Sequence, residues 1–556
     1  MASTQKLLVV AIDFGTTYSG YAFSFYNEYK LNKNAVHTTL WQAGEGLEKS
    51  TKAPTCILFD SRQRFHSFGY NAENTYSRLS DEAQKQCFFF KRFKMSLFKN
   101  ENLNERTMIK DVSGKDMLAM NVFSAGIKYL RDHFHELLQE RFSSVLTEDI
   151  HWVLTVPAIW NEAAKQFMRK AALSAEITEA RLTLALEPEA AALYCKSNIH
   201  QLGKFDKGNT FMIVDAGGGT VDVTVHKVHL SGVLKEIHSP SGGPWGGTKV
   251  DDAFQTFLLK VFGVGAIRRM SKTETLEIER EFEIFKRSFD PSATMSSVNI
   301  RIPYCLRECL DESKARSQSI RIRGDKMIVP HHTVKTFFQQ PVQKIVTHIR
   351  ELINKPGVSS TKDIYLVGGF SENKLLQKEI AQQFPYIHIH TPTEANSAVI
   401  KGAVIFGHDP DIIGWRISPY TYGIGSCCTF DHHKHPRYKL RILDGEEYCS
   451  DIFTKFITIG TTMKNGRATP YQRFCPVSRN QTVMSIEVVT SPSEDPTYTT
   501  ELGCQVLGTI KVRIPDLTGG THREVKVRMI MGGTELQVEA EDGNTGATYA
   551  AKFDCL

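Results

Sequence analysis

Residues 7–18 read Leu-Leu-Val-Val-Ala-Ile-Asp-Phe-Gly-Thr-Thr-Tyr, and residues 211–222 read Phe-Met-Ile-Val-Asp-Ala-Gly-Gly-Gly-Thr-Val-Asp. In both stretches an apolar run of strand character ends at or next to an aspartate, and glycine and threonine follow. Glycine lets the backbone approach a ligand closely, and successive N–H groups at such a turn form an anion-binding concavity. We therefore expect two matched turns that face each other and clamp the phosphate tail of a nucleotide.

The aspartates of the two turns, Asp13 and Asp215, predict a cation at the same place. Two carboxylates would repel a phosphate directly, so a positive ion is expected between them and the phosphates. Mg²⁺ is favoured because it binds a few carboxylates, several waters and phosphate oxygens.

Two other phosphate motifs are excluded. The chain has no Gly-x-x-x-x-Gly-Lys-Ser/Thr, so it has no P-loop. A dinucleotide fingerprint would need a helix after the glycines. Residues 221–225 instead alternate apolar and polar side chains, which predicts a strand and a hairpin over residues 211–228.

The paired turns resemble the two phosphate motifs of the actin-like ATPase superfamily, which includes actin, sugar kinases and the 70-kDa heat-shock proteins. Residues 154–158, 186–192 and 364–371 resemble segments of the heat-shock branch. The Gly-Gly-Phe at 368–370, with Phe-Lys-Met at 93–95, resembles the divergent heat shock 70 kDa protein 12 subfamily. The resemblance is strong over residues 6–408 and weak over 418–545.

Strands alternate with helical patterns up to Gly407, which predicts an α/β architecture. The expected helices cover residues 124–142, 163–174, 248–262, 273–289 and 334–353. Beyond Gly407 helical patterns are scarce, and short alternating segments favour a β-sandwich. Its expected strands include residues 482–490, 509–514, 524–531 and 534–540.

The resemblance divides the chain into parts. It implies a two-lobed, ribonuclease H-like ATPase domain over residues 1–408, a linker over 409–417 and a smaller β-sandwich over 418–545. Residues 546–556 are then a tail. The long helical lid of typical 70-kDa heat-shock proteins has no room in that tail, so we expect an open peptide groove.

Composition excludes several classes of protein. The net charge of +6 is spread over 556 residues without a dense Lys/Arg block, so nucleic-acid binding is not indicated. The apolar run 7–12 stops at Asp13, too short for a membrane span or a signal sequence, and predicts a cytoplasmic protein.

The cysteine usage favours free thiols. Eleven cysteines in a chain with no export signal are expected to be reduced. The pair Cys305 and Cys309, and the cluster of Cys427, Cys428 and the histidines at 432–435, lack the paired Cys-x-x-Cys spacing of a zinc site.

The resemblance assigns the phosphate end of the site. Asp13 and Asp215 would hold Mg²⁺ through water. Contacts to the phosphates of ATP or ADP are expected from Gly15, Thr16, Thr17, Gly217, Gly218, Gly219 and Thr220. Further contacts to the nucleotide are expected from Tyr18, Gly246 and Gly247. Lys91 would orient the attacking water, although a small shift in register would select Lys94 instead. Assistance to hydrolysis is expected from Glu187, Asp215, Thr220 and Asp222.

The resemblance also assigns the adenosine end. Glu283, Lys286 and Arg287 share one face of the expected helix 273–289 through i,i+3 and i,i+4 spacing. Gly368 and Gly369 would allow close approach to the ribose or base. Phe370 and Glu372 stand where typical members have a small polar residue and an arginine, so base stacking is expected to differ.

Three functions remain open at this point. The first is a slow ATPase chaperone whose β-sandwich binds extended apolar peptides and cooperates with co-chaperones. The second is an ATP-gated scaffold for signalling proteins with little hydrolysis. The third, a sugar-kinase-like transferase, is disfavoured because the strand-rich tail offers no sugar-binding constellation.

Overall fold

The structure is a computed structural model that describes residues 6–42, 49–100, 102–141, 145–198, 205–293, 297–308, 319–532 and 535–554. The chain divides into two compact units. The first unit comprises Met1–Trp160, Phe167–Val228 and Pro240–Pro410. The second unit comprises Asn161–Gln166, His229–Ser239 and Asp411–Leu556.

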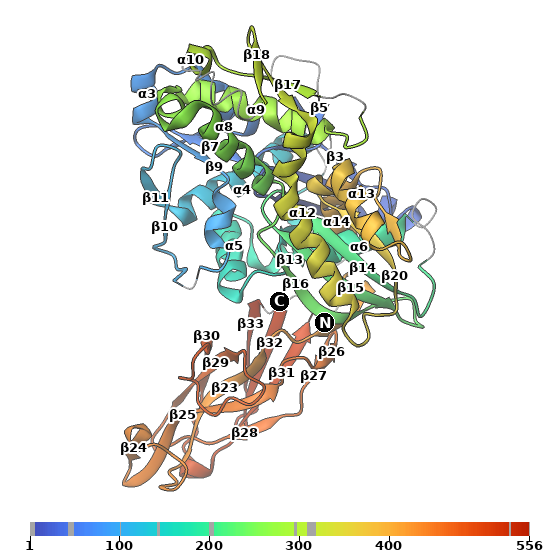
Figure 1. Cartoon of the computed structure of the whole chain (residues 1–556). Helices are drawn as coiled ribbons and strands as arrows, with labels where there is room; N and C mark the ends of the chain where they lie inside the picture. Colours follow the sequence, from blue (N-terminus) through green and yellow to red (C-terminus); the bar gives the residue numbers. More distant parts are fainter. Residues whose placement is uncertain are drawn as a thin grey trace. The chain divides into compact units, whose positions relative to one another are not determined.

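The first unit contains two sheets with the same strand order. One sheet runs β13-β12-β1-β2-β3, and the other contains the run β21-β20-β14-β15, of which β14, β15 and β20 are labelled in Figure 1. In each, an antiparallel hairpin is extended by parallel strands on the side of its first strand. The strands are β1 (Leu8–Phe14), β2 (Tyr18–Phe25), β3 (His37–Thr38), β12 (Ile150–Val156), β13 (Leu182–Leu186), β14 (Thr210–Ala216), β15 (Val221–Val228), β20 (Thr361–Val367) and β21 (His388–His390).

The central strands explain why the sequence folds this way. Every residue of β1 and of β14 is buried. A strand with a parallel neighbour and both faces covered needs a continuous apolar run, and both strands have one. Asp13 and Asp215 occupy the penultimate position of their strands, so the two sheets place their carboxylates equivalently.

The longer helices include the five that the sequence predicts. They are α2 (Gly69–Arg78), α4 (Ala119–Arg141), α5 (Glu162–Ser174), α6 (Glu187–Ser197), α8 (Thr248–Arg269), α9 (Lys272–Ser288), α12 (His331–Ile353), α13 (Lys374–Gln383) and α14 (Ala398–His408). Helix α8 continues past the expected end at residue 262 because Gly263 adopts φ 79° and joins two helical segments across a kink. Helix α9 starts where Ser271 and Glu274 form a capping box.

Helices α6 and α14 follow the outer parallel strands β13 and β21 of the two sheets. They pack very closely, because a Cβ atom on Gly402 of α14 would overlap the carbonyl group of Ala190 in α6. Only glycine leaves this space, so the crossing of the two helices depends on it.

Two five-stranded sheets make up most of the second unit. One has the order β24-β25-β23-β29-β30, and the other has β27-β31-β32-β33 with β28 beside β31. Their bounds are β23 (Thr421–Thr429), β24 (Leu440–Leu443), β25 (Glu446–Ile457), β27 (Arg467–Ala468), β28 (Gln472–Phe474), β29 (Val483–Ser491), β30 (Gln505–Arg513), β31 (Val525–Gly532), β32 (Glu535–Asp542) and β33 (Thr548–Asp554).

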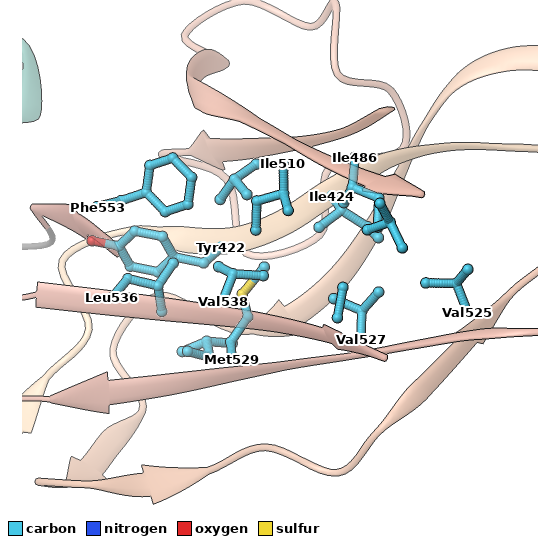
Figure 2. Close-up of a cluster of buried hydrophobic side chains, with 14 of the residues drawn as sticks. Tyr422, Ile424, Ile486, Ile510, Val525, Val527, Met529, Leu536, Val538 and Phe553 are labelled. Atoms are coloured by element: carbon cyan, nitrogen blue, oxygen red, sulfur yellow. The ribbon is translucent and has the colours of Figure 1, made fainter. Parts of the chain in front are cut away.

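One cluster of buried apolar side chains is shared by both sheets. Figure 2 shows Ile424 and Ile486 of the first sheet together with Val527 and Val538 of the second. These positions alternate with more exposed ones along their strands, as expected for sheets that bury one face.

The segments expected to be a linker and a tail both contain strands. In the expected tail, β33 pairs with β32. Phe553 of β33 lies between two charged residues in the sequence, and its side chain belongs to the shared core. In the expected linker, β22 (Ile413–Ile417) pairs in parallel with β16 (Leu234–Gly243). The last helical pattern, before the expected linker, and the last alternating pattern, before the expected tail, therefore did not mark where strand pairing begins and ends.

Among the helices in the described ranges, none combines the length and the apolar character that crossing a bilayer requires.

Candidate functional site

The two glycine turns lie against each other. A Cβ atom on Gly218 would overlap the side chain of Thr17, and one on Gly219 would overlap those of Thr16 and Met95. The first turn therefore packs on the second, as the repeated motif predicts. Both turns line one pocket of the first unit.

The pocket between the turns is rich in buried carboxylates. It is lined by Asp13, Glu187 and Asp215, and Asp222 lies behind it. Thr155 Oγ1 donates to Asp13 Oδ1 over 2.9 Å, and the Ile159 amide donates to Asp222 Oδ1 over 2.9 Å. These bonds fix two of the four carboxylates from the side of the sheet.

Burial and mutual repulsion set the acidity of this group. Burial, followed by the charges of Glu187 and Asp222, raises the pKa of Asp215 well above its ordinary value. Burial also raises the pKa of Glu187, to about 7, against the opposing charge of Lys94. Burial acts on Asp13 too, but Lys52 and Lys94 hold its pKa below the ordinary value. A bound cation would relieve the repulsion on Asp215.

Lys94, and not Lys91, lies in this pocket. Lys94 Nζ donates to Glu187 Oε1 over 2.8 Å and lies 5.1 Å from the ring centre of Trp160. Its side chain is only 2% exposed. Of the two registers that the sequence allowed, the structure places the second one at the phosphate end.

Lys91 faces a neighbouring pocket. Its ammonium is 2.8 Å from Glu279 Oε2 and 3.8 Å from Glu73 Oε1. The physical reason is the backbone of Arg92, whose φ of 57° turns the chain between strand β9 (Phe88–Lys91) and the short helix that carries Lys94. A sequence without a structure gives no signal for that turn.

Lys52 is a site residue that the sequence reading missed. Its Nζ lies 2.5 Å from Asp13 Oδ2, and it lines the same pocket. A single lysine between short strands carries no motif. Only the pairing of β6 (Ala53–Pro54) with β2 brings it to the first turn.

The amides of the second turn have different partners. Gly217 N–H donates to Thr220 O over 3.0 Å and closes the turn, which leaves the amides of Gly218 and Gly219 as the better candidates for phosphates. Gly247 N–H donates to Gly217 O over 3.1 Å. A Cβ on Gly246 would overlap the Gly218 carbonyl, so residues 246–247 brace the turn, and only Gly247 of the two lines the pocket.

The residues expected at the adenosine end line the same pocket. Glu283 pairs with Lys286 over 2.6 Å and with Arg287 over 2.8 Å. Lys286 also reaches Asp251 Oδ1 over 2.8 Å, and the Arg287 guanidinium lies 4.5 Å from the ring centre of Tyr18. Tyr18 and the face of helix α9 thus form one wall.

The turn after β20 also lines the pocket. Gly368 has φ 87°, and a Cβ there would overlap Asp215 Oδ1 and the Ala216 carbonyl, so glycine is required twice over. Gly369 and Phe370 line the pocket, and the Phe370 ring packs 3.6 Å from the Cβ position of Gly247. The pocket also includes Glu372, whose pKa is raised by burial.

This geometry fits a nucleotide with a divalent cation. Glycines at the two turns leave backbone where side chains would collide. The same pocket is lined by the carboxylates, by Tyr18 and Phe370, and by residues of helix α9. Asp13 and Asp215 would hold Mg²⁺, which would supply positive charge to the phosphate oxygens. Lys94 beside Glu187 provides a cation and a base within one hydrogen bond of each other.

The structure describes the cluster around Cys427 and Cys428 in full and the Cys305–Cys309 pair in part. In the ranges that the structure covers, no group of three or more Cys, His, Asp or Glu side chains is arranged to hold a metal ion. Cys428 Sγ lies 3.6 Å from His435 Nε2, and both residues are near the surface. Cys309 lies outside the described residues.

Comparison with known proteins places this site in a family. The family model described as Hsp70 protein matches residues 68–424. Heat shock 70 kDa protein 12A of Homo sapiens is 32% identical over 99% of this chain and 92% of its own length. Heat shock 70 kDa protein 12B of Homo sapiens is 30% identical over 99% and 91%.

A more distant match is Chaperone protein DnaK of Methanothermobacter thermautotrophicus, which is 24% identical over 99% of this chain and 80% of its own length. The similarity to the two human proteins spans both units, whereas the family model ends at residue 424, just inside the second sheet-rich part. The chain therefore belongs to the Hsp70 protein family, as a divergent member similar to heat shock 70 kDa proteins 12A and 12B.

Proposed function

We propose that this chain is an ATP-binding, slowly hydrolysing, chaperone-like protein. Residues 1–408 would act as a two-lobed, actin-like ATPase domain, and the β-sandwich from residue 418 onward would bind partners. The observation that carries the proposal is the pair of opposed turns above the carboxylates of Asp13 and Asp215, with Lys94 on Glu187.

Hydrolysis by such a site depends on positioning and charge. Lys94 is the residue that would orient the attacking water, and Glu187, with its pKa near neutrality, would accept its proton. Asp13 and Asp215 would fix the phosphates through Mg²⁺. Lys94 and Glu187 would thus act on the attacking water, and Asp13 and Asp215 would act on the phosphates.

Peptide binding is proposed for the edge strand β24. It is the outer strand of its sheet, paired on one side with β25, and it exposes Ile442 at 67% and Leu443 at 41%. An extended apolar peptide can add to such an edge through backbone hydrogen bonds while its side chains cover the exposed residues.

Calorimetry with ATP and ADP in the presence of Mg²⁺, followed by single-turnover hydrolysis, tests the proposal. Binding with slow release of phosphate supports it. Binding without any phosphate release supports the alternative of an ATP-gated scaffold. No binding of either nucleotide by the folded chain would disprove both.

A further inference from the structure

Lys52 occupies an unusual place for a lysine. Its ammonium contacts Oδ2 of Asp13, and the carboxylates of Asp13 and Asp215 are the two that would hold the divalent cation. The Lys52 side chain is 15% exposed. The other oxygen of Asp13 is taken by Thr155. The carboxylate is therefore satisfied on both oxygens by the protein itself.

The backbone around Lys52 is fixed independently of that ion pair. Residues Ala53 and Pro54 pair with Ser19 and Tyr18 in β2, and the Thr55 amide donates to Thr17 O over 2.8 Å. Gly20 leaves space for the lysine, because its Cβ position is 3.3 Å from Lys52 Cγ. Lys52 is thus directed into the pocket by the pairing of β6 with β2, the second strand of the hairpin that contains the first turn.

The charges around Lys52 indicate a role for its ammonium group in ligand binding. Asp13, Glu187 and Asp215 line the pocket, and the buried Asp222 acts on Glu187 from outside it. Among the described residues that line the pocket, two ammonium groups, those of Lys52 and Lys94, pair with these carboxylates. An isolated buried ion pair contributes little to stability. A lysine, however, carries three donors on a flexible stem, so it can keep one bond to Asp13 and turn another toward a phosphate oxygen.

We propose that Lys52 is a built-in cation for the nucleotide phosphates, which makes nucleotide binding by this protein only weakly dependent on Mg²⁺. The inference rests on the proposed nucleotide-binding function and adds a residue and a property to it. Lys94, paired with Glu187, is the residue proposed to orient the attacking water, which leaves Lys52 beside Asp13 as the ammonium for the phosphates.

The test measures ADP affinity of the full-length chain by calorimetry, once with excess Mg²⁺ and once with EDTA. We expect the parent to lose less than about tenfold in affinity in EDTA. Lys52→Met should lose about ten- to a hundredfold more, the range for one hydrogen bond to a charged group. Lys49→Met, on the exposed neighbouring residue, is the matched control and should behave like the parent.

Lys52→Gln separates charge from structure, because the amide can still donate to Asp13 while the positive charge is gone. It should show the same loss in EDTA as Lys52→Met. The inference is overturned if either folded variant keeps the parent's ratio of affinities with and without Mg²⁺. If the folded parent binds ADP under neither condition, the proposed function fails and this inference fails with it.

Discussion

At the scale of single residues, the carboxylates of the pocket make opposite contributions to stability. The raised pKa of Asp215 means that its charged form is disfavoured in the folded state, so its contribution to stability declines as pH rises above its ordinary pKa. The lowered pKa of Asp13 means the reverse, and its contribution is lost as pH falls.

Asp215→Asn should therefore stabilise the nucleotide-free protein at neutral pH while weakening Mg·ATP binding or turnover. Each pKa unit corresponds to about 1.4 kcal/mol, so a clear rise in Tm is expected. The gain should shrink as pH falls toward 4, near the ordinary pKa of an aspartate. Thermal unfolding from acid to neutral pH, together with nucleotide calorimetry, measures both effects.

Asp13→Asn is the control of opposite sign. It removes the partner of Lys52 and should lower Tm at neutral pH, with the difference vanishing in acid. Equal shifts in Tm for the two variants would contradict the account of the pocket. So would an Asp215→Asn protein that binds and hydrolyses ATP like the parent.

Lys94 and Lys91 provide a matched pair for the chemistry. Lys94→Met should lower single-turnover hydrolysis about a hundredfold or more, the usual scale for a group that positions or transfers a proton. Lys91→Met should leave hydrolysis within a few-fold of the parent, because Lys91 pairs with Glu279 in the neighbouring pocket. The reverse order of the two effects would restore the register in which Lys91 orients the water.

Phe370 should set the choice of nucleotide base. Its ring lines the pocket beside Gly247, where a base can stack on it or be displaced by it. Stacking on an aromatic ring contributes about 1–3 kcal/mol, so Phe370→Ser should change the ratio of ATP to GTP affinity by about tenfold. Competition binding measures this ratio, and an unchanged ratio would remove Phe370 from the base site.

At the scale of elements, the crossing of α6 and α14 is a sensitive point of the first unit. Gly402→Ala would drive a Cβ into the Ala190 carbonyl, and overpacking of this kind costs about 1–3 kcal/mol. Gly265→Ala, in open space in α8, should instead stabilise by about 0.5–1 kcal/mol. Chemical denaturation of both variants measures the difference, and equal stability would refute the close crossing.

Elements also show how far the sequence could predict this molecule. The two hairpins and their aspartates were predictable, because an apolar run that ends at an aspartate, with glycine and threonine close behind it, occurs twice in the chain. The i,i+4 spacing predicted that Glu283 and Arg287 share one face of α9, but their place at the nucleotide site was implied by the resemblance to the heat-shock branch. Lys52, the turn at Arg92 and the pairing of β33 were not, since each depends on contacts between segments that carry no local pattern.

At the scale of the whole molecule, the proposal requires that nucleotide in the first unit alters partner binding by the second. Coupling between two sites usually changes affinity about 5- to 150-fold. We expect ATP to change the dissociation rate of an extended apolar peptide from the full chain by about fivefold or more, because affinity differences lie mostly in off-rates. Stopped-flow anisotropy with a labelled peptide measures this rate.

One variant tests the peptide-binding site of this coupling, with a matched control, and another tests the nucleotide-binding site. Ile442→Lys, on the exposed edge strand β24, should weaken peptide binding about tenfold, since it removes roughly 1.5 kcal/mol of apolar burial. Leu517→Lys, an exposed leucine outside the strands, should not. Asp215→Asn should leave peptide affinity without nucleotide intact but abolish the response to ATP. If the parent releases the peptide at the same rate with and without ATP, the two units act independently. The proposed nucleotide site and the proposed peptide site would then have separate functions.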